Sequence, residues 1–154
     1  MMPKDLKELL LAFNEQGVRY LIVGGYAFGA HAEPRATKDL DIFISADEEN
    51  SKAVFRALAE YGAPLEGLSP RDFMDGSTFQ IGLPLARIDL LQQIDGVTFE
   101  EAWKNRIQGV LEGEIPAAVI SRDDLIRNMC SRRSHPHKLN GRSLGGCRLA
   151  YAWR

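Results

Sequence analysis

Hydrophobic positions recur along this chain with two spacings, one helical and one typical of buried strands. Glycine and proline punctuate these segments and mark where each one ends. The first half of the chain predicts a helix over Lys4–Gln16, a strand over Val18–Val23, a short helix over Tyr26–His31, a strand over Leu40–Ile44 and a helix from Ala46 or Asp47 to Tyr61. The second half predicts strands over Thr78–Leu83 and Leu85–Leu91, a helical turn over Phe99–Trp103, a hairpin of Arg106–Leu111 with Ile115–Ile120, and a helix capped by Ser121. This order predicts an α/β (or α+β) domain in which helices flank a mixed β-sheet.

Two acidic residues interrupt this pattern at the start of the second expected strand. Asp39 and Asp41 are separated by one residue, so both side chains point to the same face of the strand. Side-by-side carboxylates repel each other unless a cation lies between them. Asp89 lies on a later expected strand. If the two strands are neighbours, the three carboxylates converge at one edge of the sheet.

Gly24 and Gly25 follow the first expected strand. Glycine lets the backbone approach a bulky group, and backbone N–H groups at the start of a helix can hold phosphates. Phosphoryl or nucleotidyl transfer combines such a phosphate site with two divalent cations about 3.5–4 Å apart. We therefore expect Asp39 and Asp41 to hold both metal ions, while Asp89 holds one and helps to deprotonate the acceptor hydroxyl.

Both motifs also have purely structural explanations. A glycine pair after a strand is often only a tight turn, and an Asp-x-Asp on a surface strand is more often a solvated face. Asp41, however, lies between Leu40 and Ile42 in an apolar run, where an isolated carboxylate is costly to bury. The combination of glycines and three acids therefore favours a functional site.

Four other residues invite a functional interpretation. Arg87 shares a strand face with Asp89, and is either an ion-pair partner or a contact to a triphosphate. His31 is interpreted as a surface or capping residue and not as a catalytic base. Phe99 and Trp103 are interpreted as core residues and not as a platform for stacking a base.

The segment LIVGGYAFGAHAEPRATKDLDIFI contains both the glycine pair and the Asp-x-Asp. Together with the later Asp89, it resembles the polymerase-beta-like nucleotidyltransferase superfamily. The local sequence is most similar to the small prokaryotic branch of that superfamily, which includes the abortive-infection and minimal nucleotidyltransferases of toxin–antitoxin systems. The resemblance covers roughly residues 4–129.

This resemblance implies a nucleotidyltransferase fold and the transfer of a nucleoside monophosphate from a triphosphate such as ATP. The implied cofactor is Mg²⁺ or Mn²⁺. The implied catalytic and metal-binding residues are Asp39, Asp41 and Asp89. The implied nucleotide-binding residues are Gly24 and Gly25, to which the polar segment before the acids adds Arg35, Thr37 and Lys38.

Composition changes this picture mainly at the C-terminus. Hydrophobic residues make up 45% and charged residues 26% of the chain, which is ordinary for a globular protein. All 21 acidic residues lie in residues 1–129, whereas residues 130–154 contain Lys and Arg but no acid. We therefore expect a nucleotidyltransferase-like domain over 1–129 and an atypical basic tail over 130–154. No apolar run is long enough to span a bilayer and no signal peptide is recognised, so we expect a cytoplasmic protein.

Two explanations of the basic tail stay open. A basic tail can bind nucleic acid through phosphate contacts. A reading-frame change that replaced the native C-terminus would also give an acid-free sequence, and we favour this explanation. On this interpretation the helical pattern that begins at Asp124 is abandoned at Met129, and the tail is disordered or frameshifted. Cys130 and Cys147 fit neither a disulfide framework nor a metal site, so we expect free thiols.

The sequence thus predicts an Mg²⁺-dependent nucleotidyltransferase that acts on a hydroxyl of a protein, an RNA or a small molecule. The alternative is a non-catalytic protein of the same fold that binds nucleotide or a partner chain, as in a toxin–antitoxin component. A basic-tailed RNA-binding module is a third, weaker hypothesis. Because the site would lie on an open sheet edge, we also expect a homodimer or a helical partner protein, and no membrane.

Overall fold

The computed structural model of the chain describes residues 4–32, 39–83, 86–134 and 141–144. The described strands form one mixed sheet in the order β5-β6-β1-β2-β4-β3-β7. The helices are α1 (Lys4–Glu15), α2 (Gly24–His31), α3 (Glu48–Tyr61), α4 (Phe99–Lys104) and α5 (Arg122–Ser134), with a 3₁₀ helix η1 (Pro70–Phe73). The strands are β1 (Tyr20–Val23), β2 (Asp39–Ile44), β3 (Thr78–Leu83), β4 (Ala86–Leu91), β5 (Ile107–Leu111), β6 (Ile115–Val119) and β7 (Gly141–Leu144). The expected mixed α/β architecture is confirmed.

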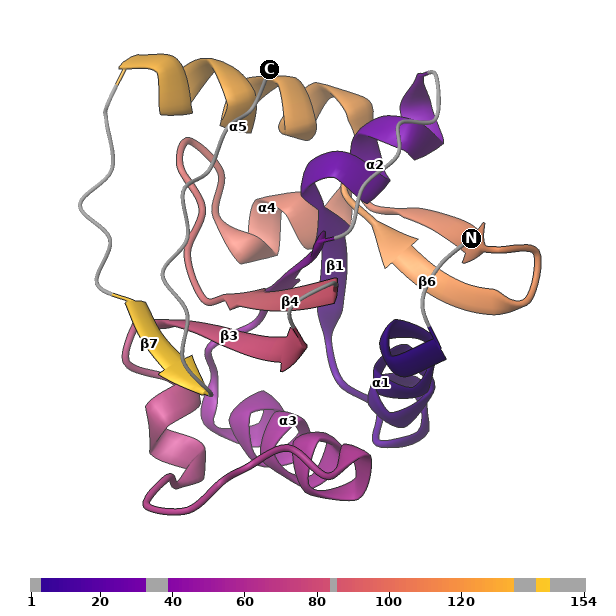
Figure 1. Cartoon of the computed structure of the whole chain (residues 1–154). Helices are drawn as coiled ribbons and strands as arrows, with labels where there is room; N and C mark the ends of the chain where they lie inside the picture. Colours follow the sequence, from indigo (N-terminus) through magenta and orange to yellow (C-terminus); the bar gives the residue numbers. More distant parts are fainter. Residues whose placement is uncertain (1–3, 33–38, 84–85, 135–140, 145–154) are drawn as a thin grey trace.

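Helices cover both faces of this sheet. α1 packs beside α3 on one face, while α2 and α5 lie together towards the other (Figure 1). Because both faces are covered, all four residues of β1 are buried, as the continuous apolar run predicts. In the part of the chain that the structure describes, no helix has the length and apolar character needed to cross a membrane.

The centre of the sheet places β2 between β1 and β4. β2 runs antiparallel to β1 and parallel to β4. Four of the six residues of β2, Leu40, Ile42, Phe43 and Ile44, belong to the apolar core. The expectation that the strands bearing the acids are neighbours is therefore confirmed.

The ends of the elements differ from expectation at two places. The first helix after β1 begins at Gly24 and not at Tyr26, because Gly24 adopts a left-handed φ of +68° that turns the chain directly from strand into helix. The segment expected as loop after Tyr61 contains η1, because Phe73 is fully buried and packs on Phe79 with ring centroids 4.7 Å apart. Tertiary packing thus orders a segment with no periodic signal of its own.

The C-terminal region also contains regular structure. α5 continues to Ser134, past the point at which the sequence pattern predicts that the helix is abandoned. Tertiary contacts explain this: the Asn128 amide donates to the Asp95 carbonyl at 2.9 Å, and Ser131 lies against Gly96. β7 then pairs in parallel with β3. The division into a domain and a tail at residue 130 stays a prediction, and Cys147 lies outside the described residues.

The aromatic pair on α4 has a structural role. Phe99 is buried, and its ring stacks on that of Trp103 with centroids 5.6 Å apart. The Arg106 guanidinium lies 3.9 Å from the centroid of Trp103 and the Arg19 guanidinium lies 5.1 Å from it. Because these neighbours occupy the ring faces, the pair does not form a platform for a base.

Candidate functional site

Two of the three expected carboxylates lie directly beside each other. The parallel register of β2 and β4 pairs Asp41 with Asp89, so their Cα atoms are one strand spacing apart, about 4.8 Å. Residues paired in a sheet point to the same face. Because side chains alternate along a strand, Asp39, two residues before Asp41, points to this face as well. It is paired with Arg87 of β4.

The two paired carboxylates are buried. Asp41 is 7% exposed and Asp89 is 0% exposed. Placing two like charges together away from water costs free energy, which hydrogen-bond donors, a proton or a cation must offset. Carboxylate oxygens are the ligands that Mg²⁺ prefers, so the chemistry of this pair fits a divalent cation.

The backbone of Gly24 closes one side of this pair. A Cβ atom added to Gly24 would collide with the Asp41 carboxylate. Any larger residue at this position would therefore have to displace Asp41, in addition to adopting a left-handed φ of +68°. The glycine motif and the acidic motif, which are separate in the sequence, form a single contact in the structure.

The same contact brings the N-terminus of α2 to the carboxylates. α2 begins at Gly24, and its N-cap residue, Val23, gives no side-chain cap hydrogen bond. The first backbone N–H groups of a helix have no partner within the helix, and the helix dipole makes this end positive. The N–H groups of Gly24 and Gly25 therefore lie at the positive end of α2, next to the acids.

Asp39 forms an ion pair with Arg87. Its Oδ2 atom lies 3.1 Å from Arg87 Nη2, and both side chains are about one-third exposed. Of the two explanations of Arg87, this contact supports that of an ion-pair partner, here of Asp39. Among the described residues, no group of three or more His, Cys, Asp or Glu side chains is arranged to hold a metal ion.

Two further residues lie at this site without a sequence signal that identified them. Gln80 of β3 is paired with Asp89 and is half-buried. Tyr26, in the first turn of α2, is also half-buried, and burial together with the carboxylates of Glu112 and Asp39 raises the pKa of its phenol. The position of Tyr26 directly after the glycine pair is the one feature that could have suggested it.

The other candidate residues lie away from the carboxylates or outside the described residues. Arg35, Thr37 and Lys38 lie outside the described residues, so their expected roles stay predictions. His31 ends α2, and its Nε2 donates to the Ile120 carbonyl at 2.8 Å, which joins the helix to the end of β6. Cys130 is exposed.

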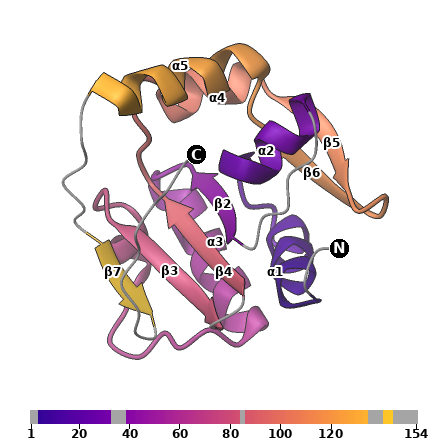
Figure 2. The ribbon, with the colours of Figure 1, turned by 45° about the horizontal axis from the view of Figure 1, so that its top comes forward.

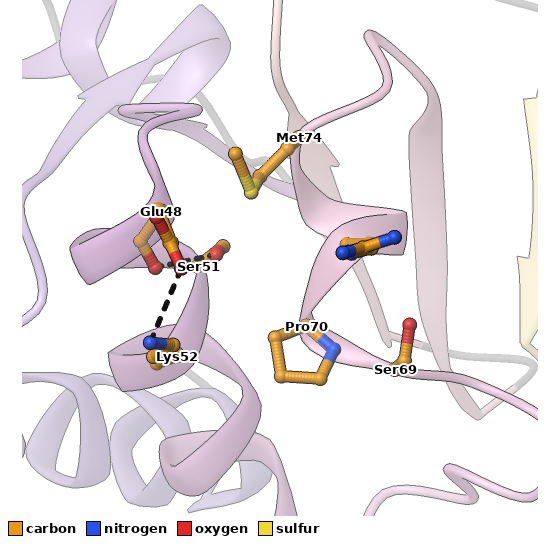
Figure 3. Close-up of a pocket in the computed structure, with 7 residues that line it drawn as sticks. Glu48, Ser51, Lys52, Ser69, Pro70 and Met74 are labelled. Carbon is orange, nitrogen blue, oxygen red and sulfur yellow. Dashed lines mark hydrogen bonds and ion pairs between the residues drawn. The ribbon is translucent and has the colours of Figure 1, made fainter.

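A cavity of about 740 Å³ lies between α3 and η1 (Figure 3). None of the three candidate carboxylates lines it. Its lining residues are Glu48, Ser51, Lys52, Ser69, Pro70, Arg71 and Met74. α3 follows the C-terminal end of β2, whereas Asp39 lies at the other end of that strand. Within the cavity the cation of Lys52 lies 3.3 Å from the Glu48 carboxylate, so part of its charge is already neutralised.

Comparison with known proteins agrees with this geometry at the level of fold. No protein-family model and no curated protein matches the chain. Among solved structures, a "putative nucleotidyltransferase" from Thermotoga maritima superposes with a TM-score of 0.59 and 13% sequence identity. The match covers 87% of this chain and 88% of that one. A likeness at this identity shows the fold alone: the chain has a nucleotidyltransferase-like fold.

Proposed function

We propose that the chain is a nucleotidyltransferase that transfers a nucleoside monophosphate from a triphosphate to a hydroxyl of a protein, an RNA or a small molecule, with release of pyrophosphate. One observation supports the proposal above the others. Asp41 and Asp89 are buried in register on adjacent parallel strands, and the backbone at the start of α2 packs against Asp41. Carboxylates and a phosphate-binding helix terminus are the two parts that this reaction requires.

Each residue of the site has a proposed role. Asp39, Asp41 and Asp89 would hold Mg²⁺ or Mn²⁺, which supplies charge that stabilises the attacking and leaving oxygens when it is bound. The N–H groups of Gly24 and Gly25 bind the β- and γ-phosphates. Asp89 accepts the proton of the acceptor hydroxyl. Because the Asp89 side chain is buried, the groups that cover it have to move before the acceptor can reach it.

The ion pair of Arg87 with Asp39 gives this site a resting arrangement. Arg87 Nη2 lies 3.1 Å from the Asp39 carboxylate. A triphosphate would offer the guanidinium a more highly charged partner, which it can bind through two parallel hydrogen bonds. Arg87 then turns to the phosphates, and Asp39 is released to complete the set of three carboxylates.

Isothermal titration calorimetry with Mg²⁺ and each nucleoside triphosphate tests the proposal. The native protein is expected to bind one or more triphosphates, and the double variant Asp39→Asn plus Asp41→Asn is expected to lose this binding. Asp123→Asn, an exposed position on α5, serves as the matched control and should bind normally. Absence of binding by the native protein, or unchanged binding by the double variant, would contradict the proposal.

One observation favours a second function. Asp39 is engaged by Arg87, and the described residues contain no assembled group of three metal ligands. A protein of this fold that binds nucleotide or a partner chain without turnover, as a component of abortive-infection or toxin–antitoxin type, would need no such group. Incubation with labelled triphosphates and cell lysate separates the two functions, because Mg²⁺-dependent transfer of label to an acceptor rejects the purely binding role.

A further inference from the structure

β5 forms one edge of the sheet, and it lacks the features that usually protect such an edge. Figure 2 shows the β5–β6 hairpin projecting from the body of the molecule, with β5 on its outer side. The strand sequence, Ile107 to Leu111, contains no charge and no proline. Val110 is 61% exposed and Ile107 is 39% exposed. Exposed apolar edge strands of this kind are templates for pairing with another strand.

The pairing of β5 with β6 shows which of its backbone groups point outwards. Val110 lies opposite Pro116, which has no N–H to donate. This is the arrangement of a non-hydrogen-bonded antiparallel pair, in which the N–H and C=O of both residues point away from the partner strand. By the alternation of the strand, Gln108 and Val110 direct these groups to the open edge.

The charges that flank β5 are arranged as a mirror image about its central residue, Gly109. Lys104 and Arg106 precede the apolar stretch, and Glu112 and Glu114 follow it at the same separations. An antiparallel copy of the strand, centred on Gly109, would bring the end of the strand that follows Arg106 against the end that precedes Glu112. Lys104 ends α4 and Glu114 lies in the turn after β5, so both lie near these ends but outside the strand register. The antiparallel copy would also place Gln108 opposite Val110, so that the outward-pointing groups of the two strands meet.

We propose that β5 is a self-association surface, on which β5 of a second copy of this chain pairs antiparallel about Gly109. The two sheets then join into one continuous sheet across a two-fold axis. Apolar side chains lie opposite one another on one face, Ile107 against Leu111. The absence of a side chain at Gly109 leaves the two backbones free to approach at the axis.

The outer charges, Lys104 and Glu114, are the ones available to favour the antiparallel arrangement. Arg106 is held in place by Trp103, because its Nη1 donates to the Trp103 carbonyl at 2.7 Å and its guanidinium stacks on the ring. Lys104 and Glu114 are exposed, and no ion pair engages either of them among the described residues. Pairing over five residues buries a small area, so we expect a weak dimer with a dissociation constant of about 10 μM to 1 mM.

Analytical ultracentrifugation and hydrogen exchange over a concentration series test the interface. The native protein is expected to dimerise, and the amides of Gln108 and Val110 to become protected as the concentration rises. Val110→Lys places a charge on the edge and is expected to weaken the dimer about tenfold or more. The matched control is Leu11→Lys, which places the same charge on an apolar α1 residue of similar exposure, 52%, and should dimerise normally. Circular dichroism confirms that both variants are folded.

A charge exchange tests the charge complementarity of the two strand ends without changing the apolar residues. Lys104→Glu alone leaves acids near both ends of each strand and is expected to weaken the dimer about threefold. Adding Glu114→Lys to the same chain restores opposite charges and should restore the dimer. A native protein that stays monomeric up to about 1 mM, a dimer that Val110→Lys leaves intact, or a double variant no better than the single one would each overturn the proposal.

Discussion

At the scale of single residues, Gly24 and Gly17 form a natural pair for comparison. Their φ angles are +68° and +67°, but nothing lies within 4 Å of a Cβ on Gly17, whereas a Cβ on Gly24 meets the Asp41 carboxylate. Gly17→Ala should therefore lower the free energy of unfolding by only the left-handed backbone cost, about 1–2 kcal/mol. Gly24→Ala should lower it by at least about 1 kcal/mol more. Urea unfolding measures both free energies, and equal losses would show that the Asp41 carboxylate moves aside at no cost in free energy.

The buried acid pair gives a second prediction at this scale. Asp89→Asn removes one of the two buried carboxylates that the proposed cation would bind, so Mg²⁺ should raise the free energy of unfolding less in this variant than in the native protein. Asp123→Asn, at an exposed position on α5, is the control and should respond to Mg²⁺ as the native protein does. Asp39→Asn breaks the partly exposed ion pair with Arg87 and, without metal ions, should lower the free energy of unfolding by about 0–1 kcal/mol. An equal response to Mg²⁺ in Asp89→Asn and the native protein would contradict the metal-binding role.

At the scale of elements, Asp47 begins α3 and makes its stability depend on pH. Burial alone would raise the pKa of Asp47, but hydrogen bonds from Ser45 Oγ and the Asn50 N–H, together with the Arg19 charge, lower it below its usual range. A carboxyl with a lowered folded-state pKa stabilises the fold above its unfolded pKa and loses this effect as the pH falls through the folded value. Asp47→Ala should cost about 1 kcal/mol at pH 7. The difference from native protein should shrink as the pH falls from the usual pKa of 3.8 through the lowered folded-state pKa, as thermal unfolding at several pH values will show.

The attachment of α5 depends on Asp124, a buried acid that accepts hydrogen bonds from neighbouring side chains. Asp124 is 2% exposed and accepts a hydrogen bond from Asn105 Nδ2, which ties α5 to the end of α4. It also accepts one from Arg127 Nη1 within α5. Asp124→Ala should cost about 2–3 kcal/mol, because it leaves these donors without their acceptor. Asp123→Ala, at the exposed neighbouring position, should cost less than about 0.5 kcal/mol. Chemical denaturation distinguishes the two, and similar losses would contradict the role of Asp124.

At the scale of the whole molecule, ligand binding should report which of two places the nucleotide occupies. Under the proposed function, a triphosphate with Mg²⁺ at one hundred times its dissociation constant stabilises the native protein by about 2.7 kcal/mol. Asp41→Asn should lose this stabilisation. Arg71→Ala, in the cavity between α3 and η1, should keep it. If differential scanning fluorimetry shows the reverse, the nucleotide binds in the cavity and not at the acids.

Sequence patterns predicted the elements well where the signal is local. The helix over α1 and the buried strand β1 follow from the spacing of apolar residues such as Leu6, Leu9 and Leu10, which are all buried. η1 and the last turns of α5 were not predictable in this way, because Phe73 and Asn128 are held by partners distant in sequence. β7 likewise exists only as a partner of β3.

The sequence by itself determined that Asp39 and Asp41 share a face, because a strand alternates with a period of two whatever lies beside it. It also determined that a glycine pair ends the preceding strand. Only the tertiary structure decided that β4 is the neighbour of β2, in the register that sets Asp89 beside Asp41 and Arg87 against Asp39. Strand pairing joins residues that are 48 positions apart, and backbone hydrogen bonding is the same in any register. The packing of the whole core, and not a local pattern, therefore selects the register on which the site depends.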